Sequence, residues 1–242
     1  MGKLVRSDLY RLFHRPYLLG LTGLLSALAI LFNLMFSADT PIQKSFQSSL
    51  DFLKFLPLFE VMIVDIVMAE ENKFATLKNT VSSGFGRSRL YAGKLITSFI
   101  LTVFCDGIAF LCYMGSAFLR MNAGDGLTAA VMADYLLRIA AAGLLVVGAM
   151  FVAMVFAVAF AKNAVYIFSF IGFVLILPLV LEGFGVRLDI FRVLYRVTIF
   201  GQAEGLYSLR TSRLYEPILV AAAHIGIGGI VGMRIFRRQE IG

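Results

Sequence analysis

Four ionisable side chains stand within or at the edge of the most apolar stretches of this chain. They are Glu60, Asp65, Asp106 and Arg138. A carboxylate at the centre of a bilayer costs about 2.5–3.5 kcal/mol on insertion scales, and such a group usually faces a bundle interior or a cavity. One interpretation is therefore that these residues are polar positions along a translocation path. Buried structural pairing and a proton relay are the alternatives.

Other residue types that could carry chemistry are too scattered to form a site. The histidines and cysteines of the chain are His14, His224, Cys105 and Cys112. Because the two histidines fall in different segments, no metal cluster is expected. A phosphate-binding loop needs the pattern G-x-x-x-x-G-K-[ST]. Its nearest match is Gly93-Lys94, which Leu95 follows, so we expect no ATP hydrolysis by this chain and no enzyme activity of its own.

The composition indicates which kind of protein positions these residues. The 242 residues are 60% hydrophobic and 15% charged, with a mean hydropathy of +0.86, whereas soluble domains are roughly 45–50% apolar and about 25% charged. These values exclude a disordered chain, a collagen and a small disulfide scaffold. The net charge of +7 is typical of Lys and Arg gathered on the cytoplasmic side of a membrane protein, so nucleic acid is not an expected partner. We predict an all-α membrane protein with one transmembrane domain over residues 1–242.

About 20 apolar residues cross a bilayer core as a helix, and the sequence predicts six such spans. The second is the poorest, because it contains Lys54 as well as two carboxylates. The predicted spans cover residues 17–36, 52–69, 95–119, 139–161, 164–181 and 217–233.

The distribution of Lys and Arg over short loops predicts orientation. With six spans, both termini lie on one side. That side holds thirteen basic residues, namely Lys3, Arg6, Arg11, Arg15, Lys73, Lys78, Arg87, Arg89, Lys94, Lys162, Arg234, Arg237 and Arg238. The other side holds seven, namely Lys44, Arg120, Arg187, Arg192, Arg196, Arg210 and Arg213. Both termini are therefore expected to be cytoplasmic.

Two flanking segments are amphipathic. Residues 1–16 form a basic helix with one apolar face, and Pro16 redirects the chain into the first span. The extracellular segment 182–216 is too charged to cross the membrane and reads as an interfacial or re-entrant helix. Its Arg192 and Arg196 lie four residues apart on one face. A helix packed on the outer rim and a substrate gate are both open interpretations.

The cytoplasmic loop 70–94 has the sequence EENKFATLKNTVSSGFGRSRLYAGK, in which acidic residues precede basic ones along a possible short helix. Phe74 and Leu77 would form an apolar knob, and Gly84 suits a left-handed helix cap. A short helix that presents such a knob among charges can dock in a groove on a partner. A solvated charged turn is the plainer interpretation.

This loop resembles the second cytoplasmic region of ABC-2 type transporter permeases, the membrane subunits of ATP-binding-cassette exporters. The resemblance rests on a glutamate followed by Thr76, Leu77, Lys78, Ser82, Arg87, Ser88, Arg89, Gly93 and Lys94. It extends to the basic N-terminus, the six spans and the outer segment. The absence of a large extracellular domain favours the small peptide or drug exporter branch over polysaccharide export.

The resemblance implies an N-terminal elbow helix, a coupling helix in loop 70–94, and a bacterial-type plasma membrane. The ATPase-docking residues would be Glu70, Glu71, Phe74, Thr76, Leu77 and Lys78, with Arg87 and Arg89 supporting the return to the membrane. A separate ATPase subunit would bind ATP and Mg, so this chain would bind no cofactor. The exported substrate would be an amphipathic or hydrophobic peptide toxin, lantibiotic or drug.

Such permeases work as pairs, so a homodimer or a related second permease is implied. Small residues in the last span, at Ala222-x-x-x-Gly226 and Gly228-x-x-x-Gly232, would let helices approach closely within the chain or between copies. One alternative function is an ion-coupled secondary transporter that uses Asp65 or Asp106. An intramembrane protease is weaker, because Glu70-Glu71 would need an arginine at position 75, where the chain has Ala75.

Overall fold

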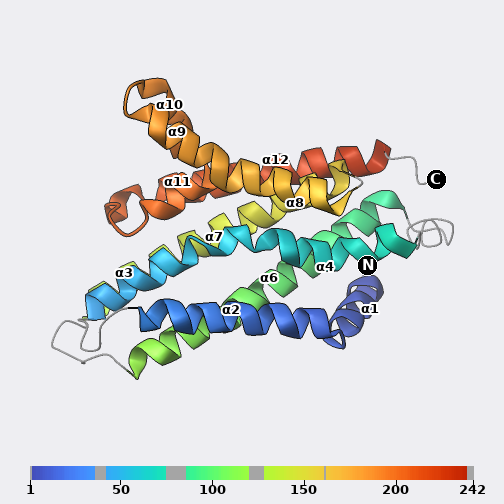
Figure 1. Ribbon diagram of the computed structural model, residues 1–242, viewed down its shortest axis with the longest axis horizontal. Helices are drawn as coiled ribbons and strands as arrows, with labels where there is room; N and C mark the ends of the chain where they lie inside the picture. Colours follow the sequence, from blue (N-terminus) through green and yellow to red (C-terminus); the bar gives the residue numbers. More distant parts are fainter. Residues whose placement is uncertain (1, 36–41, 75–85, 120–127, 161, 239–242) are drawn as a thin grey trace.

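The structure, a computed structural model, describes residues 2–35, 42–74, 86–119, 128–160 and 162–238. Within these ranges the chain forms helices joined by turns, and no strand occurs. The long helices lie side by side along one axis, with short segments at the ends and a helical pair that projects at one corner (Figure 1). The chain is thus all-α across the residues described.

Five helical segments are long and apolar enough to cross a membrane. They are α2 (Pro16–Leu34), α6 (Arg87–Phe118), α7 (Ala129–Ala159), the α8–α9 segment (Asn163–Gly185) and the stretch Thr211–Arg238 that contains α12 (Tyr215–Arg238). Of these, α7 is the most buried and the α12 stretch the least. Their length and composition indicate a multi-pass membrane protein.

The second expected span, 52–69, is not one continuous helix. α3 (Ile42–Leu53) is followed by a 3₁₀ turn, η1 (Leu56–Leu58), and then by α4 (Glu60–Phe74). Pro57 lies in the turn. Its nitrogen has no hydrogen to donate, and in a continuous helix its ring would clash with the carbonyl four residues earlier. The two short helices still run in line beside α7 along the bundle (Figure 1).

The expected N-terminal elbow segment forms α1 (Gly2–Phe13), which lies at the same end of the bundle as the last turn of α12 (Figure 1). Val5, Asp8 and Leu12 are buried on its inner face. Arg15 is extended, and Pro16 occupies the first position of α2, where its missing N–H is tolerated. The chain therefore turns sharply between α1 and α2.

At the opposite end, the helical path is irregular. α8 (Asn163–Ile171), the π-helical segment η2 (Gly172–Ile176) and α9 (Leu177–Gly185) form one continuous helix that bends. α10 (Asp189–Arg196) folds back on α9 at the projecting corner, and α11 (Ile199–Glu204) returns to α7 and α12 (Figure 1). The turn η3 (Thr211–Arg213) then leads into α12.

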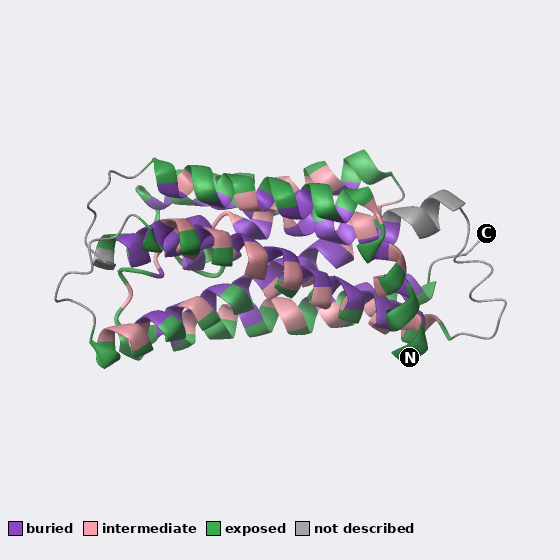
Figure 2. Ribbon diagram, turned by 90° about the horizontal axis from the view of Figure 1, so that it is seen from below, coloured by how far each residue is buried: buried purple, intermediate pink, exposed green. Residues whose placement is uncertain are grey.

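Buried residues follow the axis of the bundle, and exposed residues line its outer helices (Figure 2). α12 packs closely along α7 through small residues. A Cβ at Gly228 would lie 3.1 Å from Cβ of Phe151 and 3.2 Å from its backbone, whereas nothing lies within 4 Å of a Cβ at Gly226. Gly232 faces the hydroxyl of Tyr91. The Gly228 and Gly232 pattern therefore serves packing within the chain.

Replacing Gly228 by leucine is expected to destabilise the bundle, because the side chain would meet the backbone of α7. Overpacking of this kind costs about 1–3 kcal/mol. Gly226→Leu is the matched control, since it adds the same side chain on the same helix in open space. Thermal unfolding of the purified protein, followed by far-UV circular dichroism, should show a lower midpoint for Gly228→Leu only. Equal midpoints for the two variants would contradict the packing of α12 on α7.

Candidate functional site

The structure describes the predicted docking loop only in part. Thr76, Leu77 and Lys78 lie outside the described residues, and the structure gives only the helical backbone of Glu70, Glu71 and Phe74, at the end of α4. What the structure does describe is the point where the chain re-enters the bundle, at the first turns of α6. The contacts there determine which helices a partner on this loop would act on.

A buried ion pair joins α6 to α1. Nζ of Lys94 lies 2.8 Å from Oδ2 of Asp8, and the two side chains are 1% and 10% exposed. Arg11 lies 3.6 Å from the other carboxylate oxygen of Asp8. Leu4 of α1 packs directly over Gly93, where a Cβ would come within 2.6 Å of its side chain. A charge-assisted bond and close packing thus fix α1 on α6.

The same turns of α6 also hold the end of α12. Nε of Arg237 donates to the hydroxyl of Ser88 at 2.7 Å, and the guanidinium of Arg87 donates to the backbone carbonyl of Arg237 at 2.8 Å. Tyr91 is fully buried and packs its ring on Phe236, with centroids 5.5 Å apart. Polar contacts at the surface and an aromatic contact below them therefore attach α12 to α6.

Residues 87–94 of α6, with their contacts on α1 and α12, are called the α1–α6–α12 junction below. Loop 75–85 comes shortly before residue 87 in the chain. The sequence predicts a supporting role for Arg87, which stays a prediction, but it does not reveal Asp8 and Arg237 as partners. No local pattern could have revealed them, since they lie 86 and 150 residues from Lys94 and Arg87 respectively.

Two of the four predicted path residues come together inside the bundle. Glu60 on α4 and Asp106 on α6 lie beside each other, and the hydroxyl of Thr102 donates to Oε2 of Glu60 at 2.6 Å. Their side chains are 0% and 8% exposed. Among the described residues, no group other than these two carboxyls hydrogen-bonds to Oε1 of Glu60 or to either oxygen of Asp106. The pair is therefore a buried acidic site with unused acceptor capacity.

The other two path candidates have structural partners elsewhere. Asp65 accepts hydrogen bonds from the hydroxyl of Tyr166 at 2.8 Å and from Nδ2 of Asn163 at 3.1 Å, which links α4 to α8. Arg138 pairs with Asp134, one turn earlier on α7, at 2.7 Å. It also donates to the backbone carbonyl of Tyr207 at 3.0 Å. Arg138 therefore anchors the outer segment to α7 rather than neutralising Glu60 or Asp106.

The outer helix α10 carries the two predicted gate residues at its surface. The guanidinium of Arg192 donates to the carbonyl of Gly185 at 3.3 Å and lies 3.3 Å from Asp189. Arg196 is exposed. The hydroxyl of Tyr195 donates to Glu204 and so ties α10 to α11. Burial raises the pKa of Tyr195 above its ordinary value, so this hydroxyl keeps the proton it donates.

Across the part of the chain that the structure describes, no three His, Cys, Asp or Glu side chains gather closely enough to hold a metal ion. Comparison with protein-family models found no match, and comparison with curated proteins also found none.

Lys94→Met should destabilise the protein strongly, since it leaves the buried carboxylate of Asp8 without its nearest cation. Removing one partner of a buried ion pair costs about 3–5 kcal/mol of stability. Adding Asp8→Asn should recover part of the loss, because the unpaired charge is then removed. Thermal unfolding of the single and double variants measures both effects.

Arg213→Met is the control for this pair, because Arg213 lies 4.0 Å from Glu216 and its side chain is 60% exposed. Its effect should stay within about 1 kcal/mol. A double variant at Lys94 and Asp8 that is no more stable than Lys94→Met alone would show that the ion pair does not hold α1 on α6.

Proposed function

We propose that this chain is the membrane-spanning permease subunit of an ATP-binding-cassette exporter. In this proposal α2, the interrupted α3–α4 segment, α6, α7, α8–α9 and α12 make six crossings of a bacterial-type plasma membrane, with both termini cytoplasmic. The observation that carries the proposal is the α1–α6–α12 junction. It lies where loop 70–94 re-enters the bundle, so that a partner acting on this loop acts on three helices.

The ATPase partner docks on a coupling helix formed by Glu70, Glu71, Phe74, Thr76, Leu77 and Lys78. Since this chain lacks a phosphate-binding loop, ATP and Mg bind on that partner. When the partner closes on ATP, the loop moves α6, the Lys94–Asp8 pair carries α1 with it, and the Arg237 contacts carry α12. The partner shifts the equilibrium between inward- and outward-facing arrangements only by the difference in its affinity for the two.

A second copy of the chain completes the transport path. The α12 stretch supports this pairing, because it is the least buried of the five candidate spans and presents apolar side chains such as Ile218 and Ile230 outward. The substrate class is an amphipathic or hydrophobic molecule, such as a peptide toxin, a lantibiotic or a drug. In this account α10, with Arg192 and Arg196, covers the outer end of the path.

Leu77→Asp is expected to abolish copurification of the tagged chain with its ATP-binding-cassette subunit from the native membrane, because a charge replaces the apolar knob of the coupling helix. Leu119→Asp is the matched control: it places the same change at an exposed leucine, at the opposite end of the bundle from the junction. Copurification is measured by quantitative mass spectrometry. Equal recovery with both variants would refute the coupling helix, and the lack of any such ATPase with the wild-type chain would refute the exporter.

An ion-coupled secondary transporter is the second candidate, and the buried Glu60–Asp106 pair favours it. Two adjacent carboxyl groups without a nearby cation can take up a proton or a cation and release it on the other side. An intramembrane enzyme has no comparable support. Uptake of a fluorescent amphipathic peptide into inverted membrane vesicles distinguishes the two transporters. We expect uptake to require ATP and to survive an uncoupler, whereas uptake without ATP that an uncoupler abolishes would favour the ion-coupled transporter.

A further inference from the structure

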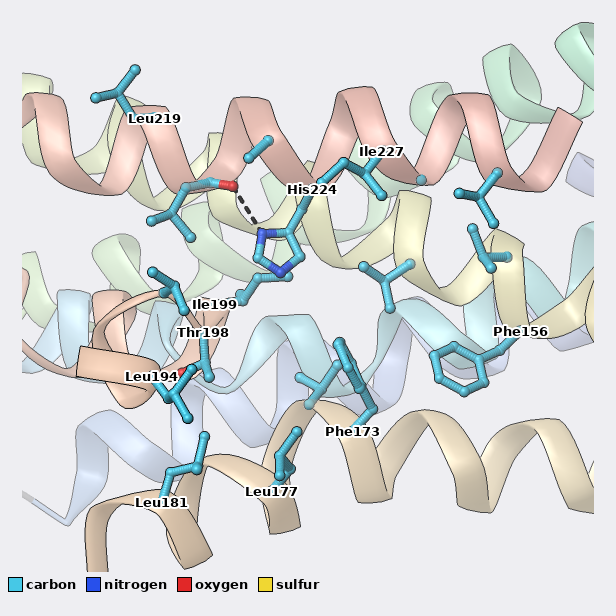
Figure 3. Close-up of a pocket in the computed structure, with 18 residues that line it drawn as sticks. Phe156, Phe173, Leu177, Leu181, Leu194, Thr198, Ile199, Leu219, His224 and Ile227 are labelled. Atoms are coloured by element: carbon cyan, nitrogen blue, oxygen red, sulfur yellow. Dashed lines mark hydrogen bonds between the residues drawn. The ribbon is translucent and has the colours of Figure 1, made fainter. Parts of the chain in front are cut away.

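A cavity of about 720 Å³ lies between α9 and α12, beside α7. It exists because the continuous α8–α9 helix bends at η2, so that α9 packs on α10 while α12 packs on α7. Figure 3 shows Phe173 and Leu177 facing α12 across this space, and Leu194 and Ile199 closing one end. Most of its lining residues belong to three candidate membrane spans, so a bilayer that these helices cross surrounds it.

The lining is almost entirely apolar, and one imidazole interrupts it. Nδ1 of His224 lies 2.8 Å from the backbone carbonyl of Val220. A carbonyl can only accept a hydrogen bond, so the ring donates from Nδ1, and in the neutral tautomer that does so Nε2 is an acceptor. Figure 3 shows the ring directed from α12 into the cavity. Among the described residues, none is hydrogen-bonded to Nε2.

Thr198, the other polar side chain in the lining, already makes two hydrogen bonds within the protein. Its hydroxyl donates to the carbonyl of Tyr195 at 2.7 Å and accepts from the amide of Gly201 at 3.0 Å. It caps the first turn of α11 and has no proton left to give a ligand. His224 is therefore the polar group in this lining that can select a ligand, and it selects for a hydrogen-bond donor.

Size and polarity together define the ligand. The volume falls within the range of about 300–1,000 Å³ that small-molecule sites occupy, and such sites combine apolar walls with a few placed polar groups. The lining has no arginine or lysine to hold a phosphate or carboxylate. A charged lipid headgroup would therefore lose its hydration here without compensation.

We propose that the space between α9 and α12, the α9–α12 cavity, binds a neutral long-chain molecule with one hydrogen-bond donor, such as a fatty alcohol. The alkyl chain lies against the apolar walls, and the donor bonds Nε2 of His224. This inference goes beyond the transport proposal, because it assigns a membrane-facing binding site whether or not the chain works with an ATPase.

The test uses the purified full chain in nanodiscs and two photoreactive probes of equal length, a dodecyl alcohol and a dodecyl hydrocarbon, each with a diazirine in the chain. Labelled residues are located by mass spectrometry. We expect the alcohol to label α9 and α12 at the cavity in the wild-type chain, and unlabelled dodecanol to compete. Ala223→Phe, which fills the cavity, should abolish this labelling. Ala222→Phe is the matched control, since Ala222 is also exposed on α12 but does not line the cavity.

The hydrogen bond is tested separately from the cavity. His224→Leu should weaken competition by dodecanol about 2- to 10-fold, the range expected for one hydrogen bond, without changing labelling by the hydrocarbon probe. His224→Gln, which keeps an acceptor, should recover much of the loss. Thermal unfolding of each variant checks that the fold is retained.

Labelling spread evenly over the lipid-facing helices, or equal labelling of Ala222→Phe and Ala223→Phe, would overturn the site. Equal loss of both probes in His224→Leu would overturn the requirement for a hydrogen-bond donor. Because no ATPase is present in this experiment, its failure would leave the exporter proposal intact.

Discussion

The buried ion pair between Lys94 and Asp8 fixes the arrangement of helices at the end of the bundle where α1 lies. The side chain of Lys94 is 1% exposed, and its Nζ lies 2.8 Å from Oδ2 of Asp8. Separating the two would leave each charge in low-dielectric surroundings, which costs several kcal/mol per ion. α1 and α6 therefore move together rather than apart. The bonds of Arg237 to Ser88 and to the Arg87 guanidinium attach α12 to the same turns of α6.

The same helix connects this junction to the buried carboxyl pair. Asp106 lies twelve residues after Lys94, about 18 Å further along α6. Its neighbour Glu60 belongs to α4, and α4 and α6 are the helices on either side of loop 75–85. A partner that moves this loop therefore acts on both helices that carry the acidic pair. This connection gives the proposed ATPase a physical route from the membrane surface to polar groups within the bundle.

Much of the fold could be predicted from the sequence, because apolar runs of about 20 residues are a strong signal for membrane-crossing helices. The division of the second span was visible in principle at Pro57, but the surrounding apolar residues suggested one helix. The π-helical segment at 172–176 had no signal, since its sequence GFVLI is as apolar as its neighbours. The bend and the cavity beside it could not be foreseen.

Some features of the candidate site could likewise be predicted from the sequence, whereas others needed the structure. The four intramembrane charges could be named from the sequence, because charges in apolar runs stand out. Which of them meet depends on helix packing, so the approach of Glu60 to Asp106 needed the structure. The partner of Arg138 was within reach of sequence reasoning, because Asp134 lies at the i,i+4 spacing that favours ion pairs on a helix. The Lys94–Asp8 pair was not, since no periodicity relates residues in separate helices.

The central claim is that motion of loop 70–94 reaches the transport path through the α1–α6–α12 junction. The most direct measurement is the amount of fluorescent amphipathic peptide transported per ATP hydrolysed by the reconstituted permease and its ATPase. For Lys94→Met the account predicts that the ATPase still binds and hydrolyses ATP while transport per ATP collapses, and that the charge-exchanged double variant Asp8→Lys/Lys94→Asp restores it. Transport per ATP that is unchanged in Lys94→Met would contradict the account.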